Sequence, residues 1–269
     1  MGADEGSYVV TPVTVIIIAG LFGALIGSFL NVCIHRLPRQ ESIVWPASHC
    51  PACMKAIAWH DNLPLISYAL LRGKCRACRA PISLRYPLVE AINAAGYAAI
   101  FCQFGVTPEA FVYAALYSAL IVVAGTDLSH QIIPDAVTLP GIVLGLLGAA
   151  VLLPLGILNS VAGLLVGGGI LWGLAWISPF LFGKEGMGGG DIKMMAMVGT
   201  VLGWKPVLLA IMLGSLIGSI VGGGLIAASV MRREEYLPFG PFLAIGSIIA
   251  LFFHDPLLNW YWSWFDLGP

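Results

Sequence analysis

Long apolar stretches with few charges recur along almost the whole chain, and they constrain its fold more than any other feature. A helix that crosses a bilayer needs about 20 mostly apolar residues. Such stretches lie at 13–34, 87–104, 108–126, 136–154, 159–182, 191–203, 206–231 and 239–253, the sixth being short for a full crossing. Their apolar residues are continuous rather than alternating, which favours helices over barrel strands. The sequence therefore predicts an all-α polytopic membrane protein with about eight transmembrane helices.

Composition excludes the main water-soluble classes of protein. Hydrophobic residues make up 59% of the 269 residues and charged residues only 10%, whereas a soluble domain has roughly 25% charged residues. So few charges cannot cover a water-facing surface, which excludes a soluble enzyme and a disordered chain. The net charge of −1 and the lack of a basic face exclude a nucleic-acid binder. The lipid bilayer is the partner that remains.

One segment, residues 35–86, is polar and carries eight of the thirteen Lys and Arg residues. Loops rich in Lys and Arg stay in the cytoplasm. If this loop is cytoplasmic, eight alternating spans leave only Lys205 outside and place four more basic residues inside, namely Lys184, Lys193, Arg232 and Arg233. The distribution predicts a multi-pass membrane protein whose polar loop lies in the cytoplasm.

The same pattern divides the chain into four parts. Residues 1–34 are expected to form the first transmembrane helix, 35–86 a cytoplasmic loop domain, and 87–254 a transmembrane bundle. Residues 255–269 form a C-terminal tail rich in Trp and Tyr, which are the residue types that gather at membrane interfaces.

Four cysteines in the polar loop have the spacing of a metal site. They form two Cys-x-x-Cys pairs separated by 21 residues: Cys50, Cys53, Cys75 and Cys78. Two such pairs present four thiolates tetrahedrally, as Zn²⁺ requires, and leave no position for a water molecule. The alternative is two disulfides, against which the cytoplasmic assignment argues. The pattern thus favours a structural zinc ion that folds a loop with little apolar core.

Two aspartates lie where charge is unfavourable. Asp127 ends the third apolar stretch, and Asp191 follows three glycines and opens the sixth. Carboxylates beside hydrocarbon are candidates for function, and alternating spans place both at the cytoplasmic face, although 64 positions separate them. Two adjacent carboxylates share a proton and titrate as a unit, which suits them to peptide hydrolysis by acid–base catalysis. The alternative is that they are a helix cap and a loop residue.

Three neighbouring residues are expected to support this pair. Gly188 and Gly190 lack side chains, so that a substrate backbone can approach the carboxylates. Lys193 either tunes the pair or faces the lipid headgroups. Asp135, which follows a proline, is expected to cap the next helix.

Taken together, these features resemble the prepilin peptidases, which are GxGD-type membrane aspartyl proteases. The resemblance covers residues from about 20 to 246. In order along the chain, the matching segments are 27–32 (GSFLNV), 36–38 (RLP), the two cysteine pairs, 61–64 (DNLP), 85–90 (RYPLVE), 127–135, 186–191 (GMGGGD) with Lys193, and 238–241 (PFGP). The resemblance implies that Asp127 and Asp191 are catalytic and that the cysteines bind zinc. It also implies that the protein lies in the bacterial inner membrane, with the zinc loop and the active site facing the cytoplasm.

The resemblance also implies the reaction and its partners. Such an enzyme removes a short basic leader from a prepilin or pseudopilin of a type IV pilus or type II secretion system, cutting after a glycine at the cytoplasmic membrane edge. It then methylates the new N-terminal amine with S-adenosylmethionine. The methyl-donor residues are expected in the 35–86 loop and near Glu90, without assignment of single residues, and no oligomeric state is predicted.

Two other classes of function fit the composition. A proton- or ion-coupled transporter also places aspartates within the membrane. A non-catalytic scaffold could use its zinc loop to bind a partner protein. Cleavage assays distinguish the three.

Overall fold

A computed structural model describes residues 12–182, 187–232 and 237–264. Several features of the sequence analysis lie outside these residues: 1–11 of the first predicted part, Lys184 and Arg233, Gly186 of the glycine motif, and 265–269 of the tail. The side chain of Trp262 is also outside the description.

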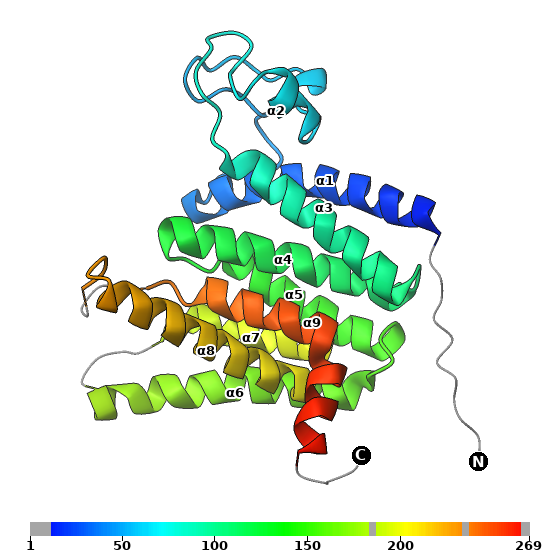
Figure 1. Ribbon diagram of the computed structural model, residues 1–269, viewed down its shortest axis with the longest axis vertical. Coiled ribbons are helices and arrows are strands. Elements are labelled where there is room, and N and C mark those ends of the chain that lie inside the picture. Colours follow the sequence, from blue (N-terminus) through cyan, green and yellow to red (C-terminus); the bar gives the residue numbers. More distant parts are fainter. Residues whose placement is uncertain (1–11, 183–186, 233–236, 265–269) are drawn as a thin grey trace. The chain divides into compact units, whose positions relative to one another are not determined.

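The described residues are helical at every predicted apolar stretch, with no β-sheet (Figure 1). The eight long helices are α1 (Val13–Arg36), α3 (Arg85–Phe104), α4 (Pro108–His130), α5 (Asp135–Val151), α6 (Gly156–Phe182), α7 (Gly189–Leu202), α8 (Trp204–Ala227) and α9 (Gly240–Ser263). The prediction of an all-α protein is confirmed. Helix α9 continues beyond the predicted bundle boundary at 254, so the described start of the predicted tail is helical.

Five of the described helical segments are long and apolar enough to cross a membrane: Val13–Arg39, Pro108–His130, Gly156–Phe180, Trp204–Ala227 and Gly240–Tyr261. Helix α5 is apolar but shorter. Helix α7 has 14 residues, which corresponds to about 21 Å at 1.5 Å per residue. A hydrocarbon core of about 30 Å is longer than that. The helices themselves match the predicted stretches, but only these five meet the length and hydropathy of a span.

Contacts divide the described chain into two compact units. The first contains residues 12–36 and 42–118, and the second contains 37–41 and the residues from 119 onward.

In the first unit, α1 packs against α3 through small residues. A Cβ atom on Gly23 would lie 2.9 Å from the backbone oxygen of Asn93, and one on Gly27 would lie 2.7 Å from the Cα of Glu90. The amide of Asn93 donates a hydrogen bond of 2.7 Å to the Gly23 carbonyl. The glycine spacing therefore brings the two backbones together, as in small-xxx-small helix pairs.

The polar loop between α1 and α3 contains little regular structure. Its described elements are the short helix α2 (Ile66–Leu70) and two 3-10 turns, η1 (Leu37–Arg39) and η2 (Trp59–Asp61). Two isolated β-bridges, His49 with Ala56 and Lys74 with Pro81, close the segments that contain the cysteine pairs. Such a loop has few internal apolar contacts to hold it, which fits a domain that depends on a metal.

In the second unit, α7 is enclosed by α5, α6, α8 and α9. Residues 194–201 are all buried, which is typical of a helix at the centre of a bundle. Gly199 of α7 and Gly163 of α6 face each other so closely that a Cβ on either residue would clash with the backbone of the other. The absence of side chains at these positions lets α6 and α7 touch backbone to backbone near the C-terminal end of α7.

Candidate active site and cysteine cluster

Asp127 lies in the last turn of α4 and is 7% exposed. Its Oδ2 atom accepts a hydrogen bond of 2.9 Å from the backbone N–H of Gly240, the first residue of α9. The chain leaves α4 through Gln131, whose φ of 54° ends the helix. The carboxylate is therefore held at the junction of two helices that are 113 positions apart in the chain.

Asp191 lies in the first turn of α7 and is also 7% exposed. Its Oδ1 atom is buried and has no hydrogen-bond partner among the described residues. A buried carboxylate oxygen without a partner is unfavourable unless a ligand, a proton or water satisfies it. Asp191 thus has an acceptor free for chemistry.

The two carboxylates are close enough to interact electrostatically. The side chain of Ile133 lies between the backbones that hold them: a Cβ on Gly190 would be 2.7 Å from Ile133 Cβ, and one on Gly240 would be 3.3 Å from Ile133 Cδ1. Gly190 directly precedes Asp191, and Gly240 binds Asp127. Gly190 and Gly240, which adjoin the two aspartates, thus share Ile133 as a neighbour in the second unit. That Asp127 and Asp191 act as a catalytic pair stays a prediction.

The three glycines before Asp191 have different surroundings. Ile133 fills the space beside Gly190, whereas a Cβ on Gly189 would meet nothing within 4 Å and one on Gly188 would meet only Asp191 Oδ2, at 3.6 Å. Room for an approaching peptide therefore lies beside Gly188 and Gly189, while Gly190 serves the packing of Ile133.

Lys193 forms an ion pair with Asp135, not with either aspartate of the pair. Its Nζ donates hydrogen bonds of 2.7 and 2.8 Å to the two carboxylate oxygens. The prediction that Asp135 caps α5 is wrong, because Pro134 occupies the N-cap position and no side chain makes the capping bond. Asp135 instead lies in the first turn, where its charge suits the helix dipole and reaches Lys193.

Sequence reasoning gave no role to Gly240 or Ile133. Within the PFGP segment at 238–241, the backbone N–H of the glycine donates a hydrogen bond to Asp127. A glycine directly before Pro241, at the start of a helix, is the sequence signal that could indicate a backbone contact there.

The four predicted ligands Cys50, Cys53, Cys75 and Cys78 form one cluster in the first unit, with all four sulfur atoms within 4.8 Å of one another. The Sγ atoms of Cys50 and Cys78 are 3.8 Å apart. A tetrahedral ZnS₄ site with Zn–S bonds of about 2.3 Å has S–S edges of about 3.8 Å. The donor set and its spacing fit zinc, and no other group of possible ligands was found among the described residues.

Both cysteine pairs have the same backbone conformation. The N–H of Cys50 bonds to the Lys55 carbonyl at 2.9 Å, and that of Cys75 bonds to the Ala80 carbonyl at 2.8 Å. The residue four positions after the first cysteine of each pair has a positive φ angle, which is 56° at Met54 and 63° at Arg79. In the second pair, hydrogen bonds from the backbone N–H groups of Cys78 and Ala77 lower the pKa of Cys75 to about 6. This thiol is thereby prepared to bind a cation as thiolate.

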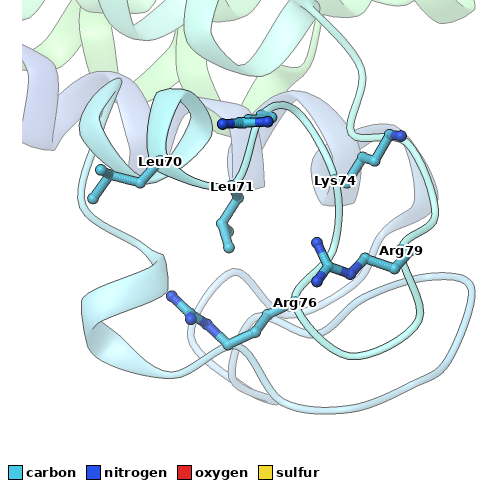
Figure 2. Close-up of a pocket in the computed structure, with 6 residues that line it drawn as sticks. Leu70, Leu71, Lys74, Arg76 and Arg79 are labelled. Atoms are coloured by element: carbon cyan, nitrogen blue, oxygen red, sulfur yellow. The ribbon is translucent and has the colours of Figure 1, made fainter.

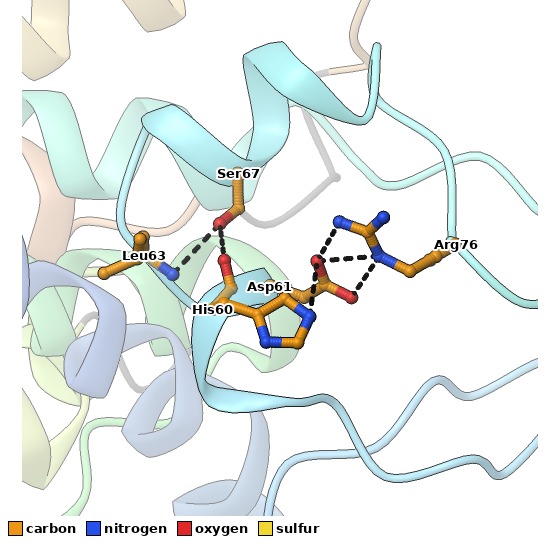
Figure 3. Close-up of polar contacts among 5 residues, drawn as sticks. All are labelled: His60, Asp61, Leu63, Ser67 and Arg76. Carbon is orange, nitrogen blue, oxygen red and sulfur yellow. Dashed lines mark hydrogen bonds and ion pairs between the residues drawn. The ribbon is translucent and has the colours of Figure 1, made fainter.

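Asp61 links the second cysteine pair to the rest of the loop. Figure 3 shows its carboxylate between the side chains of Arg76 and His60. Arg76 lies between Cys75 and Cys78, and its Nη2 and Nε donate hydrogen bonds of 2.6 and 2.8 Å to the two oxygens of Asp61. These bonds hold the pKa of Asp61 below its ordinary value. This bidentate Arg–carboxylate pair holds the second cysteine pair against η2.

Glu90 joins the loop to the helix pair of the first unit. It is 8% exposed, and its Oε2 accepts a hydrogen bond of 2.8 Å from the backbone N–H of Leu65. Leu65 has a φ of 61°, a conformation that is uncommon outside glycine. Asn31 of α1 reaches the same region and donates a bond of 3.1 Å to the Tyr86 carbonyl.

Two protein families match the chain. Residues 21–104 match the bacterial peptidase A24 N-terminal domain, and residues 114–223 match the type IV leader peptidase family. No solved structure matches.

Curated relatives cover nearly the whole chain. A protein of Aeromonas hydrophila is 40% identical over 90% of this chain and 91% of its own length. One of Pseudomonas putida is 36% identical over 95% and 94%, and one of Burkholderia pseudomallei 35% identical over 88% and 84%. All three are named prepilin leader peptidase/N-methyltransferase. None of these comparisons supports a transporter or a non-catalytic scaffold.

Proposed function

Because the chain belongs to the type IV leader peptidase family, we propose that it is a membrane aspartyl endopeptidase that removes the basic leader from prepilins or pseudopilins. It cuts after a glycine at the cytoplasmic membrane face and then methylates the new N-terminal amine with S-adenosylmethionine. The observation that carries the peptidase assignment is the proximity of two largely buried carboxylates, Asp127 and Asp191, in a membrane protein of this family.

In this mechanism, the aspartate pair shares one proton. The ionised member takes a proton from water as the water oxygen attacks the scissile carbonyl carbon, and the protonated member donates a hydrogen bond to the carbonyl oxygen. The tetrahedral intermediate collapses when the C–N bond breaks and the leaving amine receives a proton from the pair. The Gly240 N–H orients the Asp127 carboxylate, and the unpartnered Oδ1 of Asp191 supplies an acceptor for water.

The proposed topology has eight crossings with the polar loop and the aspartates on the cytoplasmic side. The five helices with the length and hydropathy of spans support a multi-pass protein. The excess of Lys and Arg in residues 35–86 supports the orientation. At that face the apolar helix of a pilin substrate lies in the bilayer, so its leader junction is at headgroup level.

The four cysteines are proposed to hold a structural zinc ion. Zinc with four sulfur ligands supplies folding energy and has no open position for substrate. The matched backbone hydrogen bonds of the two cysteine pairs and the clustering of all four sulfur atoms within 4.8 Å support this assignment.

The methyl donor is proposed to bind in the first unit, in the loop or near Glu90. S-adenosylmethionine supplies an activated methyl group to an amine. The chain's part is to bind the donor and to orient the new amine. The buried carboxylate of Glu90 and the loop segment that hydrogen-bonds to it are the polar groups of that region to which we assign these tasks.

Mass spectrometry of the N-terminus of a co-expressed pilin tests both activities at once. We expect the N-terminal peptide to lack the leader and to be about 14 mass units heavier than its unmethylated form. This difference is the mass of one CH₂ group, which a single methyl transfer adds. Processing without methylation would leave a peptidase only. An intact leader in cells that contain the folded protein would contradict the proposal.

A further inference from the structure

The polar loop contains a cleft that neither the proposed peptidase site nor the cysteine cluster uses. Its volume is about 450 Å³, and it is lined by Leu70, Leu71, Arg72, Lys74, Arg76 and Arg79. Figure 2 shows Leu71 and Arg79 extending into the same space from different segments of the loop. Four of its six lining residues are therefore basic, and the other two are leucines.

Three of these four basic side chains have no hydrogen-bond or ion-pair partner in the part of the chain that the structure describes. Arg76 is engaged by Asp61, but no hydrogen bond or ion pair involves the side chains of Arg72, Lys74 or Arg79 among the described residues. No carboxylate is among the described residues that line the cleft. Several like charges around one space repel each other, and an anion placed among them relieves that repulsion.

At two of these positions the backbone conformation does not favour arginine over other residues. Arg72 and Arg79 have φ angles of 51° and 63°, in the left-handed region that glycine or asparagine adopts most easily. Arg79 shares this conformation with Met54, the equivalent residue of the first cysteine pair, so the turn itself does not require an arginine. The two arginine side chains are therefore available for a ligand.

The position of the cleft favours a lipid headgroup over a soluble anion. Arg79 is six residues before Arg85, where α3 begins, so an extended chain keeps it within about 20 Å of that helix end. Helix α3 packs along α1, which has the length and hydropathy of a membrane span. Leu70 is 75% exposed beside the cations, and apolar side chains next to Lys and Arg are typical of surfaces that contact anionic membranes.

We propose that Arg72, Lys74 and Arg79 form a binding site for the phosphate of an anionic phospholipid headgroup, with Leu70 and Leu71 against its glycerol and acyl carbons. A basic leader peptide has the wrong charge for this cleft. We therefore assign to this site the binding of the membrane surface and no role in peptide cleavage.

The test uses the purified full-length protein in a neutral detergent, with dihexanoyl phosphatidylglycerol as the probe and binding measured by calorimetry. Each cation next to an anionic lipid surface contributes about fivefold in affinity. We therefore expect Arg72→Gln or Arg79→Gln to weaken binding about fivefold, and the double variant about 30-fold. Zinc content and melting temperature, unchanged in each variant, establish that the loop remains folded.

Lys55→Gln is the matched control, because it removes one exposed charge from the same loop outside the cleft. It should change binding less than about twofold. An equal loss in Lys55→Gln and Arg79→Gln would overturn the site in favour of a general charge effect. Equal binding of dihexanoyl phosphatidylcholine would overturn anion recognition, and glycerol 3-phosphate binding as tightly as the lipid would overturn the lipid assignment.

Discussion

Gly240 and Gly190 lie against the side chains around the aspartate pair, whereas Gly189 faces open space. A Cβ on Gly240 would be 2.7 Å from Asp127 Oδ2, well inside van der Waals contact. The N–H of the same residue bonds to that oxygen. Gly240 thus combines a donor with the absence of a side chain, and only glycine provides both at this distance.

Gly240→Ala should strongly reduce cleavage, since the methyl group displaces the Asp127 carboxylate from its position. A misplacement of about 1 Å at a reacting group lowers the rate by roughly 100-fold. The measurement is kcat for leader removal by the purified protein.

Gly173→Ala is the control for this change, because it adds the same methyl group to a glycine of α6 where a Cβ would meet nothing within 4 Å. It should leave kcat within a few-fold of the wild type. Equal activity of both variants would contradict the close packing of Gly240 against Asp127.

The Asp61–Arg76 pair predicts how the loop responds to acid. Arg76 holds the pKa of Asp61 below its ordinary value, so the pair stabilises the folded loop fully above the ordinary carboxyl pKa of about 4. That contribution is lost as the pH falls through the lowered pKa of the folded state.

Limited proteolysis of the loop, followed from pH 7 to pH 3, measures this effect. Wild-type protein should become more susceptible only at the acid end. Asp61→Asn should be more susceptible than the wild type at pH 7, and the two should converge at low pH. Parallel curves for the two proteins would show that the pair does not stabilise the loop.

Functional residues could be predicted from the sequence where the residue type and its local surroundings alone indicate a function. A carboxylate in an apolar stretch and a Cys-x-x-Cys pair are informative without any partner, which is why Asp127, Asp191 and the four cysteines could be selected. The partners could not: Gly240 is 113 positions from Asp127, and Asp135 is 58 positions from Lys193. Nothing local in the sequence specifies such pairings.

At the scale of elements, the Lys193–Asp135 ion pair joins the N-terminal part of α7 to the first turn of α5. Asp191 is in the same turn as Lys193, and the segment from Asp127 to Asp135 connects α4 to α5. The pair therefore positions both segments that carry the aspartates. Both side chains are about half exposed, so the pair itself adds little stability, about 0.5 kcal/mol or less.

Lys193→Asp or Asp135→Lys alone should lower kcat several-fold. Each single change places two like charges opposite each other, and their repulsion pushes the N-terminal ends of α7 and α5 apart. The combined exchange should recover most of the activity, since it restores an ion pair of reversed direction. Melting temperatures should change little throughout. If the double variant were as impaired as the product of the two single variants, the two residues would not act as a pair.

The helices were predictable because apolar stretches of sufficient length leave the chain few alternatives in a bilayer. Close contact at Gly23 and Gly27, and at Gly214, also follows from small residues spaced four apart. The enclosure of α7 was not predictable. Its apolar pattern resembles that of a lipid-facing helix, and its burial depends on glycines such as Gly163 on a different helix.

At the scale of the whole molecule, the aspartate pair belongs to one compact unit and the cysteine cluster to the other. Cys50→Ser or Cys75→Ser should reduce bound zinc from about one ion per chain to near zero, because a site of this kind needs all four thiolates. Metal analysis of the purified proteins measures this, and proteolysis should show an unfolded loop.

Cys102→Ser is the control, since this exposed cysteine lies on α3 outside the cluster. It should retain full zinc. Unchanged zinc in Cys50→Ser and Cys75→Ser would contradict a site made of four thiolates.

The most direct test of the central claim is leader cleavage by purified Asp127→Asn and Asp191→Asn variants in the same lipid environment as the wild type. Asparagine keeps the shape of each side chain but cannot exchange the proton. Each variant should lose at least about 100- to 10,000-fold in rate, while zinc content and melting temperature remain those of the wild type. Normal cleavage by either variant would contradict a shared-proton aspartate pair as the catalyst.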